Sequence, residues 1–156
     1  MRFLLVDRIE TVEPGVRIVG WKNAAMSEDY FEWHFPERPI VPGVLILEAF
    51  VQMAGWLEAA SSDFQRWFLL DRVRTARYYA FAGPGDRIDL SLEVTKEGTD
   101  AADRRVYTGV SRVGDTRGAV VEFEGRVVPL EALDGAARAR RDFQTLRGAE
   151  PSTEGR

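Results

Sequence analysis

The sequence predicts a single α+β domain in which a long antiparallel sheet wraps around one buried helix. Three observations carry this prediction: two apolar runs separated by a Pro-Gly pair, a long proline-free apolar stretch after them, and strict alternation of apolar and polar residues in the second half. A length of 156 residues, 45% of them hydrophobic, suits one globular domain with a substantial core.

The first two apolar runs predict a β-hairpin. Phe3–Val12 and Val16–Ala24 are rich in Leu, Val and Ile, and Pro14-Gly15 lies between them. Pro followed by Gly suits the two central positions of a type II turn, which would join the runs as antiparallel strands.

An irregular loop and a buried helix follow the hairpin. The aromatic segment Tyr30–Phe35 is followed by three prolines between residues 36 and 42, a density that neither helices nor central strands tolerate. From Val44 to about Ser62 the chain has no proline and carries apolar residues on nearly every helical face. A helix that is apolar all round is a buried one, so this segment is expected in the core.

Four more strands are expected after the helix, from Phe68 to Pro129. The alternation is strict over Arg87–Val94 and returns over Val121–Glu124, as antiparallel strands with one wet face require. Turns or loops are expected at Gly83–Asp86, Glu97–Asp103 and Gly114-Asp115. The sheet of about six strands must wrap around the helix, since nothing else could cover it, and this is the hotdog architecture. One helix face would still need a cover, which a second copy of the chain could supply.

The domain boundary is expected near residue 130. Residues 1–130 form the hotdog domain in this prediction, and residues 131–156 form a C-terminal extension. The Ala- and Arg-rich segment Glu131–Arg147 is expected to be partly helical, and the part from Gly148 onward to be disordered.

Composition excludes several kinds of function. The chain has no cysteine and one histidine, so disulfides, sulfur-based zinc sites and multi-histidine metal sites are not expected. A net charge of -4, from 21 basic and 25 acidic residues, argues against nucleic-acid binding. The apolar opening Phe3–Val6 is too short for a signal peptide, and no apolar run reaches the ~20 residues of a membrane span. We therefore expect a cytoplasmic protein without metal or membrane association.

Candidate catalytic residues gather between residues 34 and 52. Histidine titrates near neutral pH, so His34 is the natural proton carrier, although a lone loop histidine can also be structural. Pro42-Gly43 opens the helix, where unpaired backbone N–H groups could form an oxyanion site or Pro-Gly could simply follow a turn. Glu48 lies in apolar surroundings that disfavour ionisation, so it could hold a proton to donate, or could reach solvent or a partner's arginine. Gln52 follows at i+4 on the same face.

These groups supply one base, one acid and one oxyanion donor. That is the minimum for removing a proton α to a carbonyl and expelling a β-hydroxyl as water. Over about its first 130 residues the chain resembles the 3-hydroxyacyl-[acyl-carrier-protein] dehydratases of fatty-acid synthesis. The likeness is carried by His34-Phe35-Pro36-Glu37-Arg38-Pro39-Ile40-Val41-Pro42-Gly43-Val44-Leu45, by Glu48-Ala49 and Gln52, by Phe3–Arg8 and by Gly83–Asp86.

The resemblance implies a hotdog-fold lyase that converts (3R)-3-hydroxyacyl thioesters on acyl carrier protein to trans-2-enoyl thioesters. It implies that His34 takes the C2 proton and that the Gly43 amide polarises the thioester carbonyl. Glu48 would then protonate the leaving C3 hydroxyl, and Gln52 would orient the substrate or a water molecule. It also implies a homodimer, or a higher assembly of dimers, in which His34 of one chain meets Glu48 of the other. No cofactor is implied beyond the phosphopantetheine arm, and glutamate rather than aspartate at position 48 implies no double-bond isomerisation.

Other functions stay open at this point. A non-catalytic acyl-binding hotdog subunit would use the same tunnel without turnover. Asp29 and His34 have the spacing of the catalytic pair of R-specific enoyl-CoA hydratases, although the residues between them do not match, and hotdog thioesterases lack the proline-rich loop. Trp33 and Glu37 stand where the dehydratases often have small residues, so the tunnel mouth is expected to differ. Three arginines could dock the acidic carrier protein or be solvated strand residues: Arg72, Arg74 and Arg77.

Overall fold

The computed structural model describes residues 3–95, 103–133 and 135–148. Its strands are β1 (Arg8–Glu13), β2 (Arg17–Asn23), β3 (Arg66–Tyr78), β4 (Arg87–Thr95), β5 (Arg104–Val113) and β6 (Thr116–Pro129). Its helices are α1 (Gly43–Ser61) and α2 (Ala136–Arg147), with the short 3-10 turns η1 (Asp29–Glu32) and η2 (Leu130–Ala132).

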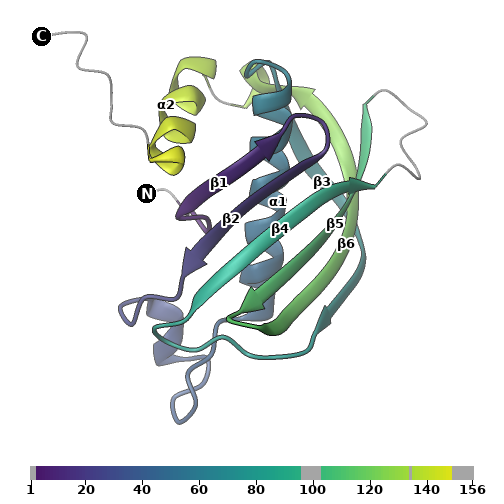
Figure 1. Cartoon of the computed structure of the whole chain (residues 1–156). Coiled ribbons are helices and arrows are strands. Elements are labelled where there is room, and N and C mark those ends of the chain that lie inside the picture. Colours follow the sequence, from purple (N-terminus) through teal and green to yellow (C-terminus); the bar gives the residue numbers. More distant parts are fainter. Residues whose placement is uncertain (1–2, 96–102, 134, 149–156) are drawn as a thin grey trace, which may run out of the picture.

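The six strands form one antiparallel sheet in the order β1-β2-β4-β5-β6-β3. The sheet curves around α1, which runs along its concave side (Figure 1). The predicted α+β class, the strand count and the hotdog architecture are therefore confirmed. Within the described chain the sheet ends at β1 on one side and at β3 on the other, so β3 presents an outer row of backbone groups.

The first hairpin forms as predicted, but it begins later. Val16 N donates to Glu13 O over 2.9 Å, and Gly15 has a φ of 70°, as the third residue of a type II turn requires. The first strand was expected from Phe3, whereas β1 starts at Arg8. The reason is a side-chain contact: Leu5 N donates to Gln52 Oε1 of α1 over 3.0 Å, so this backbone leaves the sheet to meet the helix.

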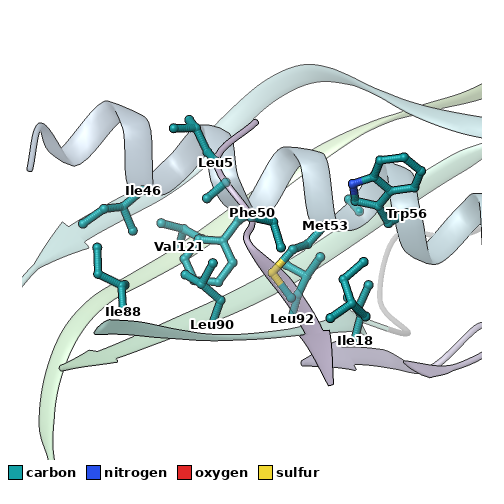
Figure 2. Packing of buried hydrophobic residues seen from close by; sticks show 14 of the residues in the cluster. Leu5, Ile18, Ile46, Phe50, Met53, Trp56, Ile88, Leu90, Leu92 and Val121 are labelled. Atoms are coloured by element: carbon teal, nitrogen blue, oxygen red, sulfur yellow. The ribbon is translucent and has the colours of Figure 1, made fainter. Parts of the chain in front are cut away.

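The core lies between α1 and the sheet. Phe50, Met53 and Leu57 project from α1 and are fully buried. Figure 2 shows Phe50 and Met53 facing side chains such as Ile18 of β2 and Leu90 and Leu92 of β4. Burying each of these large side chains contributes about 1.5–3 kcal/mol, so this layer is a main source of stability.

The burial of α1 differs along its length. All residues from Met53 to Ala59 are buried, as the prediction of a helix covered all round requires. Nearer the start, Val44 is 65% exposed, and Leu47, Glu48 and Val51 are only partly buried. The single chain therefore leaves one face of the first half of α1 uncovered.

By length and composition alone, α1 could also cross a membrane. Its apolar face instead packs against the sheet, and 56% of its most apolar window is buried inside the protein. This burial identifies α1 as the core helix of the fold.

The C-terminal residues add a second helix to the hotdog domain. Helix α2 lies beside β1 (Figure 1), and Arg147 Nη1 of α2 donates to Glu10 O over 2.7 Å. The predicted division into residues 1–130 and 131–156 stays a prediction. Residues 96–102 and 149–156, which include most of the predicted polar loop and disordered end, lie outside the described residues.

Candidate active site

His34 is held in the loop between η1 and α1 by its own backbone and ring. His34 N donates to Tyr30 O over 2.9 Å, and Ile40 N donates to His34 O over 2.9 Å. The ring atom Nδ1 lies 3.0 Å from Ile40 O. A carbonyl oxygen only accepts, so Nδ1 must carry the hydrogen, and in the neutral ring Nε2 carries the lone pair. The contact with Ile40 O therefore leaves Nε2 as the ring nitrogen that can accept a proton.

His34 and the start of α1 line the same hollow. Its volume is about 480 Å³, and its walls include His34, Gly43, Ile46, Tyr78 and Phe81. The sequence places these residues up to 47 positions apart, and only the fold brings β3 and the segment after it against the loop. The structure therefore brings together two of the predicted groups, the histidine and the amide at the helix start.

Gly43 is the first residue of α1, and its lack of a side chain has a structural reason. A Cβ atom at this position would lie 2.8 Å from two ring carbons of Tyr78. The ring can lie against the helix start because Gly43 is small. The first-turn N–H groups of a helix are unpaired and carry roughly half a positive charge, so this end of the hollow suits an anionic oxygen.

Tyr78 was not predicted from the sequence. Burial raises the pKa of its hydroxyl, which therefore stays protonated at neutral pH and can donate a hydrogen bond in the hollow. A tyrosine at the end of a strand carries no sequence signal for such a role. Its contact with Gly43 is the feature that reveals it.

Glu48 is not part of the hollow that contains His34. It lies on the partly uncovered face of α1, where its Oε1 accepts a hydrogen bond from Gln52 Nε2 over 3.0 Å. Within one chain the structure therefore does not join the predicted base and the predicted acid in one cavity.

Gln52 uses its side-chain amide to link Glu48 to the beginning of the chain. Nε2 donates to Glu48 Oε1 and to Phe3 O, each over 3.0 Å, and Oε1 accepts from Leu5 N over 3.0 Å. A primary amide has two N–H donors, so both are engaged within the protein. In this arrangement Gln52 positions Glu48, and the partners at Phe3 and Leu5 are backbone atoms, which leave no residue-type signal in a sequence.

The three arginines of β3 that were considered for carrier-protein docking differ in their contacts. Arg74 pairs with Glu122 of β6 over 3.0 Å and with Glu124, so its charge is matched within the sheet, while Arg72 and Arg77 are exposed.

In the part of the chain that the structure describes, no three His, Asp or Glu side chains gather in a way that could hold a metal ion.

By sequence, this chain is similar to a family of known dehydratases. A family model described as the FabA-like domain matches residues 1–122. The chain is 44% identical to the 3-hydroxyacyl-[acyl-carrier-protein] dehydratase FabZ of Anaeromyxobacter sp. strain Fw109-5 over 100 residues, which cover 60% of this chain and 63% of that protein, a little under two thirds of its length. It is 40% identical to FabZ of Anaeromyxobacter sp. strain K over 133 residues, 83% of each chain.

Solved structures with the same fold are more distant in sequence. The dehydratase heterocomplex ApeI:P from Xenorhabdus doucetiae matches with a TM-score of 0.62 and 14% identity, over 80% of this chain and 99% of that chain. The fluoroacetyl-CoA thioesterase FlK matches with a TM-score of 0.61 and 14% identity, over 85% of this chain and 98% of that chain. At these identities the structural likeness shows the fold alone.

Proposed function

The chain belongs to the FabA-like family, and from this membership we propose that it is a hydro-lyase of fatty acid biosynthesis. Its substrate is a (3R)-3-hydroxyacyl thioester on acyl carrier protein, and its product is the trans-2-enoyl thioester. The observation that carries the proposal is the pairing in one hollow of His34, whose Nε2 is free to accept a proton, with the start of α1. The curated relatives named FabZ support the choice of substrate.

The first half of the reaction uses His34 and the helix start. His34 Nε2 takes a proton from C2 of the substrate, and the bond between Nδ1–H and Ile40 O stabilises the imidazolium that forms. Negative charge develops on the thioester oxygen as the C2–H bond breaks. The backbone amide of Gly43, at the positive end of α1, receives that charge.

The second half uses Glu48. The electrons of the former C2–H bond form the C2=C3 double bond, and the C3–O bond breaks. Glu48 gives its proton to the leaving hydroxyl, which departs as water, and Gln52 holds the carboxyl in place. A proton passed from His34 to Glu48 through solvent then restores both groups.

A complete site needs two chains in this proposal. Glu48 lies outside its own chain's His34 hollow, on a helix face that a single chain leaves uncovered. In a symmetric dimer, Glu48 of each chain can meet His34 of the other chain, which gives two equivalent sites. The edge strand β3, which carries the half-exposed apolar residues Leu70 and Val73, supplies a surface for this contact.

The acyl chain arrives on the phosphopantetheine arm of acyl carrier protein, and the reaction needs no metal or other cofactor. The protein acts in the cytoplasm as a homodimer or an assembly of dimers.

The direct test is an activity assay with the purified protein. Dehydration of 3-hydroxybutyryl and 3-hydroxydecanoyl groups on acyl carrier protein, and the reverse hydration of crotonyl groups, should be measured beside the matching CoA thioesters. We expect turnover on the carrier protein, and a loss of roughly 10²-fold or more in kcat in His34→Ala and in Glu48→Gln. Glu93→Gln, at an exposed position of β4 that does not line the hollow, is the control. Full activity in either catalytic variant would exclude its assigned role, and a strong preference for CoA thioesters would favour a hydratase.

A further inference from the structure

A second cavity lies beside the far half of α1. Its volume is about 300 Å³, and it is mainly apolar. Its walls come from five parts of the chain and include Phe3, Trp56, Trp67, Leu130, Leu133 and Ala139. The ring of Trp67 in β3 packs directly on α1 at Gly55. Glycine allows this contact because it has no Cβ atom, and a Cβ atom there would collide with the ring. We propose that this cavity, called here the tail chamber, receives the distal end of the acyl chain and that α2 is its end wall. The inference rests on the proposed function.

The tail chamber continues the line of the candidate acid along α1. Glu48, Gln52 and Trp56 are spaced four residues apart, so they share one stripe of the helix. Two helical turns separate the first from the last, or about 12 Å along the axis. Phe3 connects the Glu48–Gln52 pair to the chamber. Its carbonyl oxygen accepts a hydrogen bond from Gln52 Nε2, and Phe3 also lines the chamber. An acyl chain whose C3 lies at Glu48 and whose tail follows this stripe therefore ends in the chamber.

Aromatic packing holds the inner wall of the chamber. The rings of Trp56 and Trp67 meet edge to face with centroids 4.9 Å apart. Phe143 of α2 packs on Trp56 at 5.9 Å and on Phe64 at 5.4 Å. Helix α2 is thus part of the same aromatic cluster that forms the chamber.

Polar contacts fix α2 at both ends. Arg140 donates to Asp63 Oδ1 over 2.8 Å and to Asp63 O over 2.7 Å, and its guanidinium lies 4.8 Å from the centre of the Phe64 ring. Near the other end Arg147 donates to Glu10 O over 2.7 Å. A wall held in this way gives the chamber a fixed depth. The enzyme should therefore favour acyl chains long enough to fill the chamber and should discriminate against longer ones.

The inference can be tested by a substitution in α2 that places a larger side chain in the chamber. Ala139 is 5% exposed and lines the chamber, whereas Ala137 is exposed on the same helix. Activity of Ala139→Phe should be measured on 3-hydroxydecanoyl and 3-hydroxybutyryl groups on acyl carrier protein. We expect the ratio of kcat/KM for the long over the short substrate to fall by about 10-fold or more, because each methylene excluded from an apolar pocket weakens transition-state binding by a comparable factor. Ala137→Phe is the matched control and should keep the wild-type ratio.

A second variant guards against a failure of Ala139→Phe to fold. Leu133 also lines the chamber but is 50% exposed, so the ring of Leu133→Phe can enter without displacing buried atoms. An unchanged ratio in the folded variants would overturn the inference even if the wild-type enzyme is active.

A binding measurement separates failure of the inference from failure of the proposed function. Trp56 and Trp67 line the chamber, so decanoyl-pantetheine should change the tryptophan emission and acetyl-pantetheine should not. Ala139→Phe should abolish the change. A wild-type protein that shows this response but no turnover would contradict the proposed function alone, and a protein with turnover but no response would contradict the tail chamber alone.

Discussion

Gln52 Nε2 donates to Glu48 Oε1 over 3.0 Å, one helical turn away on α1. The same nitrogen donates to Phe3 O, and Leu5 N donates back to Gln52 Oε1. The segment before β1 is therefore tied to the candidate acid through one amide. Gln52 acts here as a positioning residue, because its donors are used within the protein.

Gln52→Leu should lower kcat more than it raises KM. The substitution removes the hydrogen bond that orients Glu48 and leaves Phe3 O and Leu5 N without their partner. We expect kcat to fall by roughly 10-fold or more, since misplaced proton donors lose much of their effect. Steady-state kinetics on one substrate measure the split.

Gln52→Glu provides a readout that a purely structural role would not change. It places a second carboxyl beside Glu48, and two carboxyls at one site do not readily ionise together. The basic limb of the pH–rate profile should therefore move to higher pH. An unmoved profile in a folded Gln52→Glu protein would argue against contact between this amide and the candidate acid Glu48.

Mixing two inactive variants should restore activity if the site is shared between chains. A dimer of one His34→Ala chain and one Glu48→Gln chain contains one intact pair and one doubly altered pair. Random exchange of subunits should recover about a quarter of wild-type activity, since half of the dimers are mixed and each has one working site. Each variant alone, taken through the same exchange, is the control. Recovery of no activity, with exchange confirmed by mass spectrometry, would place both groups in one chain.

Gly43→Ala should disturb the hollow through Tyr78. The added methyl group would lie 2.8 Å from the Tyr78 ring, so the ring must move away from the helix start. We expect lower activity and a loss of stability of about 1–3 kcal/mol, as for other overpacked positions. Gly43→Ala combined with Tyr78→Ala should regain the stability in a urea titration. If the double variant is no more stable than Gly43→Ala, the ring contact is not the cause.

Glu58 is a buried carboxylate outside the proposed reaction, and it should matter for stability. It is 5% exposed, and its Oε1 accepts from Tyr107 Oη over 2.7 Å and from Arg105 Nε over 3.1 Å. Burial, and then the neighbouring Glu58 carboxylate, raise the pKa of Tyr107, so this hydroxyl remains a donor. These bonds fasten α1 to β5.

Glu58→Ala should destabilise the fold by about 3–5 kcal/mol, because it takes the acceptor away from the buried Tyr107 hydroxyl and the paired charge away from Arg105. Tyr107→Phe removes one bond to a charged group and should cost about 1.5–3 kcal/mol. Glu131→Ala, at an exposed position of η2, should change stability by less than about 0.5 kcal/mol. Urea unfolding measures all three, and equal effects of Glu58→Ala and Glu131→Ala would refute the role of the network.

The contact between Arg140 and Asp63 should make the attachment of α2 sensitive to acid. The hydrogen bond from Arg140, and then its charge, lower the pKa of Asp63 from its ordinary value of 3.8. A lowered pKa in the folded protein means that the contribution to stability is present above about pH 3.8 and is lost as the pH falls through the folded value. An NMR titration of the Asp63 carboxyl should show the lowered pKa in the wild type and a return toward 3.8 in Arg140→Gln. Identical titration curves would contradict this pairing.

Much of this protein follows from local sequence. Pro14-Gly15 fixes the first turn, the proline-free apolar stretch fixes α1, and the alternating residues of Arg87–Val94 fix which face of β4 is buried. These features depend on backbone stereochemistry and on the burial of apolar side chains, which act over a few residues. The motif around His34 and Glu48 is likewise written in consecutive positions, so the candidate catalytic groups could be named before the fold was known.

Contacts between distant segments were decided only by the tertiary structure. The sequence did not show that β1 would begin at Arg8, because the backbone of Leu5 leaves the sheet for the amide of Gln52, 47 positions away. It did not show Tyr78 against Gly43, or α2 closing a cavity beside Trp56. Such contacts depend on which surfaces the folded sheet brings together. No local residue pattern predicts the partner of a backbone atom or of a helix far along the chain.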